Sequence, residues 1–191
     1  YVRENVMHFE VCESRFSHYL AGQKRLLPVG EASNSLAVAM LPITTDNCAI
    51  LAQTASTSES AEKLKFFGGA AEPSDCLPEI PVKMQQILER ELNEEFPYLV
   101  KNTAQSLGRP IAVIKPGGTG VVVVFPYYLE VLSHEAISNF RRDSDPDQEI
   151  DCAVSVPLDR KEFLNYKNSM SLALPYVLPV LETHILKTNL P

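Results

Sequence analysis

The sequence lacks the residue patterns that mark several classes of protein. Its four cysteines are far apart and none belongs to a C-x-x-C pair. We therefore expect reduced thiols in a cytoplasmic protein, with neither a zinc site nor a disulfide framework. The four histidines form no H-x-x-x-H or H-x-x-E-H pattern, and no serine nucleophile elbow is present. The longest apolar run, residues 121–129, has the length of a strand, so no membrane span is expected. A targeting segment removed before Tyr1 stays compatible with the sequence.

Positive charge is scarce as well. The 191 residues include 17 Lys and Arg against 24 Asp and Glu, for a formal net charge of −7. Broad contact with a nucleic-acid backbone needs clustered cations, so we do not expect a nucleic-acid partner. Phosphate chemistry stays open, because a bound divalent metal ion supplies positive charge locally. With 45% hydrophobic residues, the chain is typical of one globular domain, which we take to cover residues 1–191.

Short apolar segments predict strands along most of the chain. Strands are expected within residues 1–32 and at residues 35–44, 48–52, 63–67, 110–115, 121–132 and 150–156. Asp46-Asn47 marks a turn, so the second and third of these segments are expected to form a hairpin. Residues 70–81 contain three prolines and are expected to be mostly loop.

The periodicity changes after this loop. Met84, Ile87, Leu88 and Leu92 recur at spacings of three and four, which predicts one central helix over residues 82–96. Pro97 is expected to stop this helix. A turn with a short helix is expected over residues 157–166, and a C-terminal helix at about 172–187. This order favours an α/β sandwich with a mixed β-sheet over a doubly wound parallel sheet.

Three glutamates on the central helix are candidates for a chemical site. Glu91, Glu94 and Glu95 stand at i, i+3 and i+4, so they share one face with Cβ atoms about 5–6 Å apart. Like charges at this spacing repel each other, and Mg²⁺ or Mn²⁺ would relieve the repulsion because hard cations prefer oxygen ligands. Taken alone, the run is better explained as a solvated helix face, because glutamate-rich helices are common.

The segment before the helix favours the metal site. Gly68 and Gly69 follow an apolar strand, where glycine lets the backbone turn sharply and approach a ligand closely. Glu72, Pro73 and Asp75 come next, in the loop that leads to the helix.

Together these residues resemble the sequence motif of the Nudix hydrolase family, G-x5-E-x7-R-E-U-x-E-E-x-G-U, in which U is aliphatic. Gly69 and Asp75 match its first glycine and glutamate, and Gly68, Glu72 and Pro73 match the G-G-x-x-E-P phrase that often precedes that acid. The second half of the motif is matched by Arg90, Glu91, Leu92, Glu94 and Glu95.

The chain departs from the motif at three points. Asp75 replaces the glutamate, Pro97 stands where the motif has glycine, and fourteen residues instead of seven separate Asp75 from Arg90. We place the extra seven residues in the loop over residues 76–81 and at the start of the helix. None of these departures touches the three glutamates. The longer loop resembles that of a Nudix branch that acts on UDP-glucose.

The resemblance covers roughly residues 33–165. It implies a Nudix-like α/β/α sandwich and a Mg²⁺- or Mn²⁺-dependent hydrolase that cleaves the diphosphate linkage of a nucleoside diphosphate derivative. UDP-glucose, a nucleotide sugar, is one such small-molecule partner. The alternatives are a catalytically inactive Nudix-fold module that binds a nucleotide and a protein-interaction module. The oligomeric state stays open, a homodimer included.

The resemblance also implies roles for particular residues. The metal would be held by Glu91, Glu94 and Glu95, with the carbonyl of Gly69 and the carboxylate of Glu149, which precedes a strand ending in a V-P-L-D turn. Either Glu94 or Glu149 would be the catalytic base. Arg90 is expected to brace the glutamates by ion pairing. The remaining matched residues, Gly68, Glu72 and Asp75, are expected at the substrate loop.

Overall fold

The computed structural model describes residues 2–3, 6–7, 26, 35–56, 62–72, 75, 84–101, 108–115, 120–140, 149–159, 162 and 165–166. Strands β1 (Val2–Arg3) and β2 (Val6–Met7) form an antiparallel pair in the N-terminal region where strands were expected. The C-terminal helix predicted at about 172–187 and the loop over residues 76–81 lie outside the described residues.

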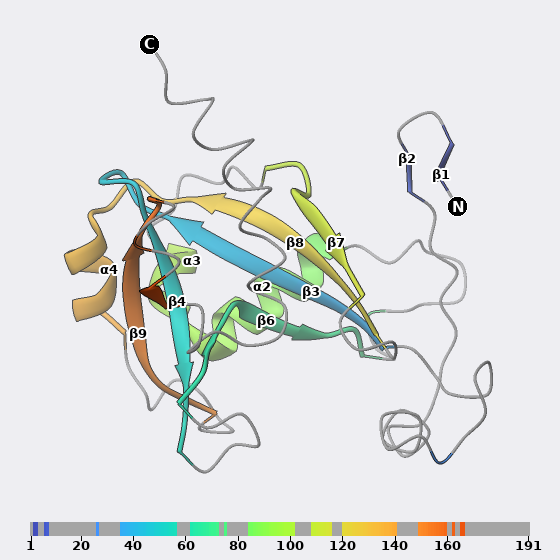
Figure 1. Ribbon diagram of the computed structural model, residues 1–191, viewed down its shortest axis with the longest axis horizontal. Helices are drawn as coiled ribbons and strands as arrows, with labels where there is room; N and C mark the ends of the chain where they lie inside the picture. Colours follow the sequence, from blue (N-terminus) through green and yellow to red (C-terminus); the bar gives the residue numbers. More distant parts are fainter. Residues whose placement is uncertain are drawn as a thin grey trace.

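A mixed sheet forms the centre of the fold (Figure 1). Its strands are β3 (Ser35–Ile43), β4 (Cys48–Thr54), β5 (Leu64–Lys65), β6 (Phe67–Ala70), β7 (Ala112–Ile114), β8 (Gly120–Tyr128) and β9 (Ile150–Pro157). The main order is β5-β4-β3-β8-β7, with β6 paired to β3 and β9 paired to β4. The β3–β8 pair is parallel along its whole length, and the other pairs described in this sheet are antiparallel. The predicted mixed sheet is confirmed.

The predicted hairpin exists only around its turn. Strands β3 and β4 pair at Ile43 and Ala49 and then diverge. Strand β6 pairs with the part of β3 that β4 leaves unpaired, from Ala37 opposite Ala70 to Met40 opposite Phe67. The divergence therefore brings the segment with the two glycines into the sheet.

Two strand predictions need correction. The strand expected at residues 63–67 is two strands, β5 and β6, and Gly68 and Gly69 lie inside β6 instead of following a strand. The strand expected to reach Leu132 ends at Tyr128, and helix α4 (Ser133–Ser138) follows. An exposed leucine at position 132 made the apolar run look longer than the strand is.

The central helix is confirmed as α2 (Met84–Glu95). Its apolar face buries Ile87, Leu88 and Leu92 against the sheet. Pro97 does end α2, but it also begins a further helix, α3 (Pro97–Lys101), so the expected single central helix is wrong. Proline suits a first helical position because the missing N–H would have no partner there and its φ is already helical.

Side chains alternate between the two faces of the sheet, as strand geometry requires. Along β3, Val38 and Met40 face the helices, whereas Ala39 and Leu41 join a second buried cluster. Helices α2 and α3 pack on one side, shown behind the sheet in Figure 1, and α4 contributes Ala136 to the same buried cluster. There Phe96, fully buried between α2 and α3, contacts the rings of Phe67 and Phe140 at centroid distances of 5.5 and 5.1 Å. This packing fixes α2 and therefore its polar face. No helix in the described part of the chain is long and apolar enough to cross a membrane.

Candidate active site

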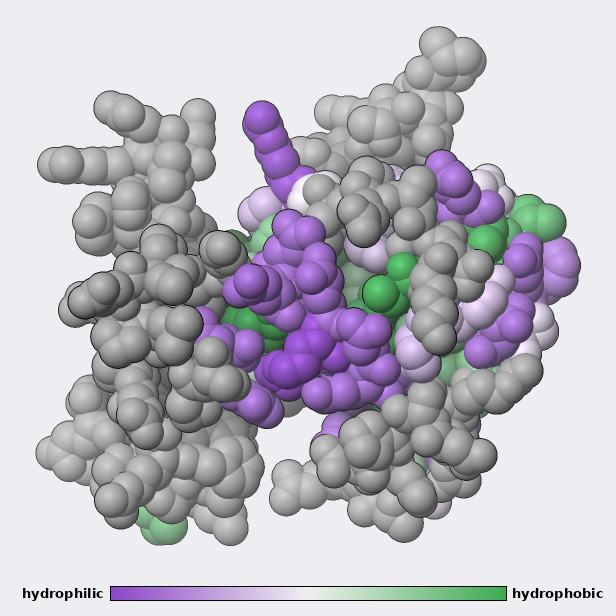
Figure 2. All heavy atoms as spheres, turned by 180° about the vertical axis from the view of Figure 1, so that it is seen from behind, coloured by the Kyte–Doolittle hydropathy of each residue, from purple (hydrophilic) through white to green (hydrophobic). Residues whose placement is uncertain are grey.

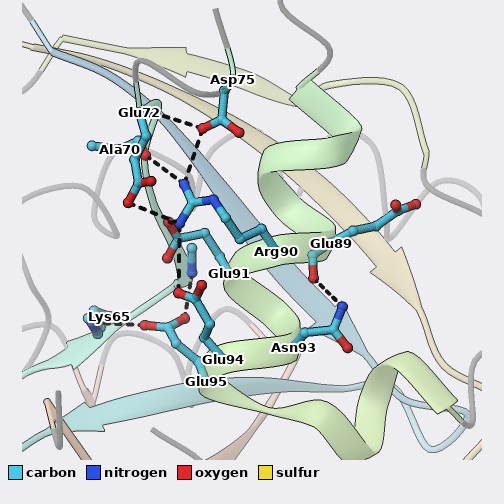
Figure 3. A network of polar contacts seen from close by, with 11 residues as sticks. Lys65, Ala70, Glu72, Asp75, Glu89, Arg90, Glu91, Asn93, Glu94 and Glu95 are labelled. Atoms are coloured by element: carbon cyan, nitrogen blue, oxygen red, sulfur yellow. Dashed lines mark hydrogen bonds and ion pairs between the residues drawn. The ribbon is translucent and has the colours of Figure 1, made fainter. Parts of the chain in front are cut away.

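The polar face of α2 faces strands β5 and β6 (Figure 3). Glu91, Glu94 and Glu95 point to the same side of the helix, as their spacing predicted. Glu95 is buried, Glu91 is half-buried, and the side chain of Glu94 is 45% exposed. Figure 2, seen from behind, shows hydrophilic residues gathered at the middle of the side that carries α2. The three carboxylates thus extend from the core edge to solvent.

Arg90 ties the loop after β6 to the helix. Its Nη2 atom lies 3.2 Å from Oδ2 of Asp75 and donates to the carbonyl of Ala70 at 3.1 Å. Its Nη1 atom lies 3.4 Å from Oε1 of Glu72. Asp75 also accepts a hydrogen bond from the backbone N–H of Glu72 at 2.8 Å. These contacts hold Glu72 and Asp75 beside the helix.

Arg90 also braces the helix carboxylates. The Nη1 atom is 2.8 Å from Oε1 of Glu91 and 3.7 Å from Oε2 of Glu94. Burial raises the pKa of Glu91, although Arg90 opposes this effect. Burial alone would lower the pKa of Arg90, but Glu91, Asp75 and Glu72 raise it above its ordinary value. The expected bracing role is consistent with this geometry.

Glu95 has different partners. Its carboxylate accepts the backbone N–H of Gly68 at 2.8 Å and lies 3.2 Å from Nζ of Lys65. The same ammonium lies 3.2 Å from Oε2 of Glu149. Burial raises the pKa of Glu95 to about 7, although Lys65 and the amide of Gly68 both favour its ionised form. Burial alone would lower the pKa of Lys65, but Glu95 and Glu149 raise it. Glu95 and Lys65 therefore form a partly desolvated ion pair.

Both glycines of β6 lie where a Cβ would collide with a neighbouring group. Gly68 has φ +123°, and a Cβ there would collide with the carbonyl oxygen of Val38 on β3. A Cβ on Gly69 would collide with the carboxylate of Glu91. The glycines approach β3 and a helix carboxylate closely, and the expected approach to a ligand or metal stays a prediction.

A β-bulge brings Glu149 to the cluster. The β4–β9 register pairs Gln53 with Cys152 and then Thr54 with Ile150, which leaves one residue of β9 without an opposite residue. The next amide, of Ala55, donates to the carbonyl of Glu149 at 2.7 Å. Bulges of this kind re-aim side chains near functional sites. The exposed carboxylate of Glu149 is thereby held where Lys65 reaches it.

Comparison by sequence finds no matching family model and no matching curated protein. Solved structures do match the fold. A mutT/nudix family protein from Listeria innocua aligns with TM-score 0.57 and 17% identity, over 82% of this chain and 96% of that one. The Nudix domain of NrtR from Shewanella oneidensis, in complex with ADP-ribose, aligns with TM-score 0.52 and 12% identity, over 90% and 99%. The chain has the Nudix fold.

One further Nudix-fold match comes from a longer protein. A bifunctional NMN adenylyltransferase/ADP-ribose pyrophosphatase from Francisella tularensis, complexed with AMP and a Mn ion, aligns with TM-score 0.50 and 17% identity. The alignment covers 90% of this chain and 47% of that one, so the chain spans about half of its length. At these identities the likeness establishes the predicted Nudix fold and leaves the UDP-glucose branch a prediction.

The Nudix fold gathers all the predicted site residues into one region. Six carboxylates surround two cations, Arg90 and Lys65; they are those of Glu72, Asp75, Glu91, Glu94, Glu95 and Glu149. Within the described ranges, no three Asp, Glu, His or Cys side chains converge on a point that would hold a metal ion. The donor set nevertheless fits Mg²⁺ or Mn²⁺ in its chemistry, because every donor is oxygen and the acids outnumber the cations.

Sequence reasoning missed Lys65. The only sequence signal was a lysine between apolar residues of a short strand. Neighbouring residues do not show which acid such a lysine pairs with. Its partners lie 30 and 84 positions further along the chain.

Proposed function

We propose that the chain is a metal-dependent Nudix hydrolase that cleaves the diphosphate linkage of a nucleoside diphosphate derivative. The observation that carries this proposal is that Glu91, Glu94 and Glu95 share one face of α2 on a Nudix fold, with Glu149 linked to Glu95 through Lys65. A solvated helix face would leave these carboxylates apart from the rest of the chain, whereas here Glu95 is buried and Glu91 lies against Gly69. A cytoplasmic location stays a prediction from the cysteine pattern.

The substrate class follows from the ligands of similar folds. The Shewanella Nudix domain was crystallised with ADP-ribose, and the Francisella protein with AMP and a Mn ion. ADP-ribose is a nucleoside diphosphate joined to a second group, which is the class that the motif resemblance implied. We take ADP-ribose as the first substrate to test and UDP-glucose as the second.

The reaction would add water across one P–O bond of the diphosphate bridge and give two phosphate monoesters. Glu91, Glu94, Glu95, Glu149 and the carbonyl of Gly69 are the groups that would hold divalent metal. When bound, that metal would neutralise phosphate oxygens and lower the pKa of a bound water.

The chain's own residues would position the reactants and move one proton. Arg90 holds Glu91 in place and fixes the loop beside it. Glu94 is our first choice for the general base. Of the four ion pairs of Arg90, the pair with Glu94 is the longest at 3.7 Å, and the side chain of Glu94 reaches solvent. Glu149 is the second choice, since Lys65 holds its carboxylate at 3.2 Å.

A second candidate function is a Nudix-fold module that binds a nucleotide without cleaving it. Arg90 and Lys65 already pair with the carboxylates, which favours this alternative because paired acids bind metal less readily. The departures of this chain from the Nudix motif at Asp75 and Pro97 also favour a binding module.

Turnover distinguishes the two candidates. We would measure phosphate release, coupled to a phosphatase, from ADP-ribose, UDP-glucose, dinucleoside polyphosphates, NAD-like dinucleotides and nucleoside triphosphates. Each would be assayed with Mg²⁺, with Mn²⁺ and with EDTA. We expect turnover of one substrate class, lost in EDTA and restored by metal. Binding of ADP-ribose in a calorimeter with no turnover of any substrate would establish the binding module instead.

A further inference from the structure

Lys65 connects two acids that come from distant parts of the chain. Its ammonium lies 3.2 Å from Oε1 of Glu95 on α2 and 3.2 Å from Oε2 of Glu149, which precedes β9. Figure 3 shows Lys65 of β5 beside Glu95 of α2, joined by this ion pair. Lys65 stands before the first glycine of the Nudix motif, so the motif resemblance gives it no role.

The three side chains differ in their exposure to solvent. That of Glu95 is 9% exposed, that of Lys65 is 21% exposed and that of Glu149 is 61% exposed. Lys65 is therefore anchored at its buried end, where its charge needs the carboxylate of Glu95 as a partner. Glu149 stands largely in water, where an unrestrained side chain has many rotamers open to it. Among the described residues, the ion pair with Lys65 is the contact that connects the Glu149 side chain to the cluster.

The sheet explains how Lys65 reaches Glu149. Ala52 of β4 lies opposite Lys65 of β5 and opposite Ala153 of β9, so β5 and β9 flank β4. Two strand spacings, about 10 Å, separate β5 from β9. A lysine and a glutamate side chain cover this span together, because paired residues point to the same face of a sheet. Ala52 and Ala153 present only methyl groups on that face, which leaves room for the lysine side chain to cross β4.

Two contacts attach Glu149 to the sheet. Its carbonyl accepts the backbone N–H of Ala55 at 2.7 Å, and its carboxylate pairs with Lys65. The next residue, Ile150, is fully buried on the side of the helices. Because the carbonyl and the carboxylate belong to one residue, the ion pair also resists opening of the backbone hydrogen bond.

The ion pairs of Lys65 leave both acids able to bind metal. A carboxylate has about four lone-pair sites on its two oxygens. Lys65 and the amide of Gly68 take one site on each oxygen of Glu95. Lys65 takes one site on Oε2 of Glu149, and no contact among the described residues uses Oε1 of that side chain. Lys65 is thus compatible with the metal ligands proposed above.

We propose that Lys65 is a positioning residue that keeps the Glu149 carboxylate turned toward the glutamates of α2. The inference deepens the proposed function and rests on it, because it assumes that Glu149 takes part in the reaction as a metal ligand or as the base. Lys65 acts through Glu149 in this role. The competing explanation is that Lys65 serves only to neutralise the buried Glu95.

A double-mutant cycle separates these two explanations. We would measure kcat and KM at saturating Mg²⁺, with the substrate that the wild type turns over, for Lys65→Met, Glu149→Gln and the double variant. Lys65→Met keeps the length of the side chain and removes its charge, whereas Lys65→Arg keeps the charge. Lys115→Met is the matched control, because Lys115 is exposed after β7, at the opposite end of the main strand order. If circular dichroism shows that Lys65→Met does not fold, Lys65→Gln replaces it, because an amide keeps a donor without the charge.

We expect Lys65→Met to lower kcat about 10–100-fold and to leave KM nearly unchanged, since residues that orient a metal ligand have effects of this size. Lys65→Arg should recover most of kcat, and Lys115→Met should match the wild type. In the Glu149→Gln background, Lys65→Met should lower kcat by a smaller factor, because no carboxylate is left to position. Equal factors in both backgrounds overturn the inference and assign the effect to Glu95. A loss confined to KM, or no recovery by Lys65→Arg, overturns it as well.

Hydrogen exchange tests the same contact without turnover. The amide of Ala55 reports on Glu149, which accepts its hydrogen bond, and the amide of Leu158, bonded to the carbonyl of Asn47 at 3.0 Å, reports on the other end of the β4–β9 pair. We expect Ala55 to exchange about two- to fivefold faster in Lys65→Met, which is the effect of losing one partly exposed ion pair. Leu158 should exchange at the wild-type rate. An equal change at both amides, or no change at Ala55, overturns the inference.

The outcomes distinguish this inference from the proposed function. No metal-dependent turnover by the wild type contradicts the hydrolase, and the exchange rate of Ala55 then decides by itself whether Lys65 holds Glu149. Turnover by the wild type with equal kinetic factors in both backgrounds contradicts the role of Lys65 and leaves the hydrolase standing.

Discussion

The carboxylate of Glu91 lies against Gly69, in the space where the side chain of any other residue would begin. Helix α2 and strand β6 meet there with only a hydrogen atom between the Cα and the acid. The neighbouring Gly68 is constrained differently, by a φ of +123° and by the carbonyl of Val38. One glycine therefore serves the site, and the other serves the backbone of the sheet.

Alanine at these two positions should have different effects. Gly69→Ala should push the Glu91 carboxylate aside and lower kcat about 10²-fold, since a displacement of 1 Å at a reacting group has that effect. Gly68→Ala should lower the free energy of unfolding by about 1–3 kcal/mol, because a positive φ strains any residue with a Cβ. Urea unfolding and the phosphate-release assay measure both effects. Equal loss of stability in the two variants would contradict the distinction.

Glu94→Gln should abolish turnover while the fold stays intact. A general base contributes about 10²–10⁴-fold to the rate, and the amide cannot take the proton. Glu89→Gln on the same helix is the control, because Glu89 is exposed and its carboxylate accepts a hydrogen bond from Gln85 outside the cluster. Phosphate release by both variants, with circular dichroism for the fold, is the measurement. Wild-type activity in Glu94→Gln would move the base to Glu149.

Asp46 should stabilise the fold above its unfolded pKa. Its carboxylate accepts the backbone N–H of Ser133 at 3.0 Å and the hydroxyl at 2.6 Å, so the β3–β4 turn caps helix α4. Burial alone would raise the pKa of Asp46, but the hydrogen bonds from Ser133 and Thr44 hold it below its ordinary value. Asp46→Ala should cost about 0.5–2 kcal/mol at pH 7.

The pH dependence gives this prediction its sign. A carboxylate with a lowered folded-state pKa contributes stability above the unfolded value, about 3.9 for Asp, and loses it as the pH falls through the folded value. The difference between wild type and Asp46→Ala in urea unfolding should therefore narrow below about pH 4. Glu130→Ala, at an exposed position nearby, should stay within about 0.5 kcal/mol of wild type at every pH. A constant difference for Asp46→Ala would mean that its charge does not matter.

Local patterns in the sequence predicted the elements that have a strong periodicity. Helix α2 followed from four apolar residues at helical spacing, and the strands at residues 35–44 and 150–156 were correct to within a residue or so. The patterns failed where an element is short. Helix α3 has five residues and α4 has six, too few for a periodic signal, and α4 depends on a cap from the distant Asp46.

The candidate site divides in the same way. That Glu91, Glu94 and Glu95 share a face follows from helix geometry, which acts over a few residues and needs no knowledge of the rest of the chain. Helix geometry does not predict which cation pairs with each glutamate. The predicted triplet is split, with Glu91 and Glu94 on Arg90 and Glu95 on Lys65.

The sequence by itself determined the helix, its acidic face and the two glycines beside it, because periodicity and spacing are local properties. Only the tertiary structure decided that β6 lies along β3, that a bulge in β9 brings Glu149 to the cluster, and that Lys65 stands between Glu95 and Glu149. Each of these depends on pairing between strands far apart in the chain. Such pairing is selected by the burial of whole faces and by backbone hydrogen bonds, which no single segment encodes.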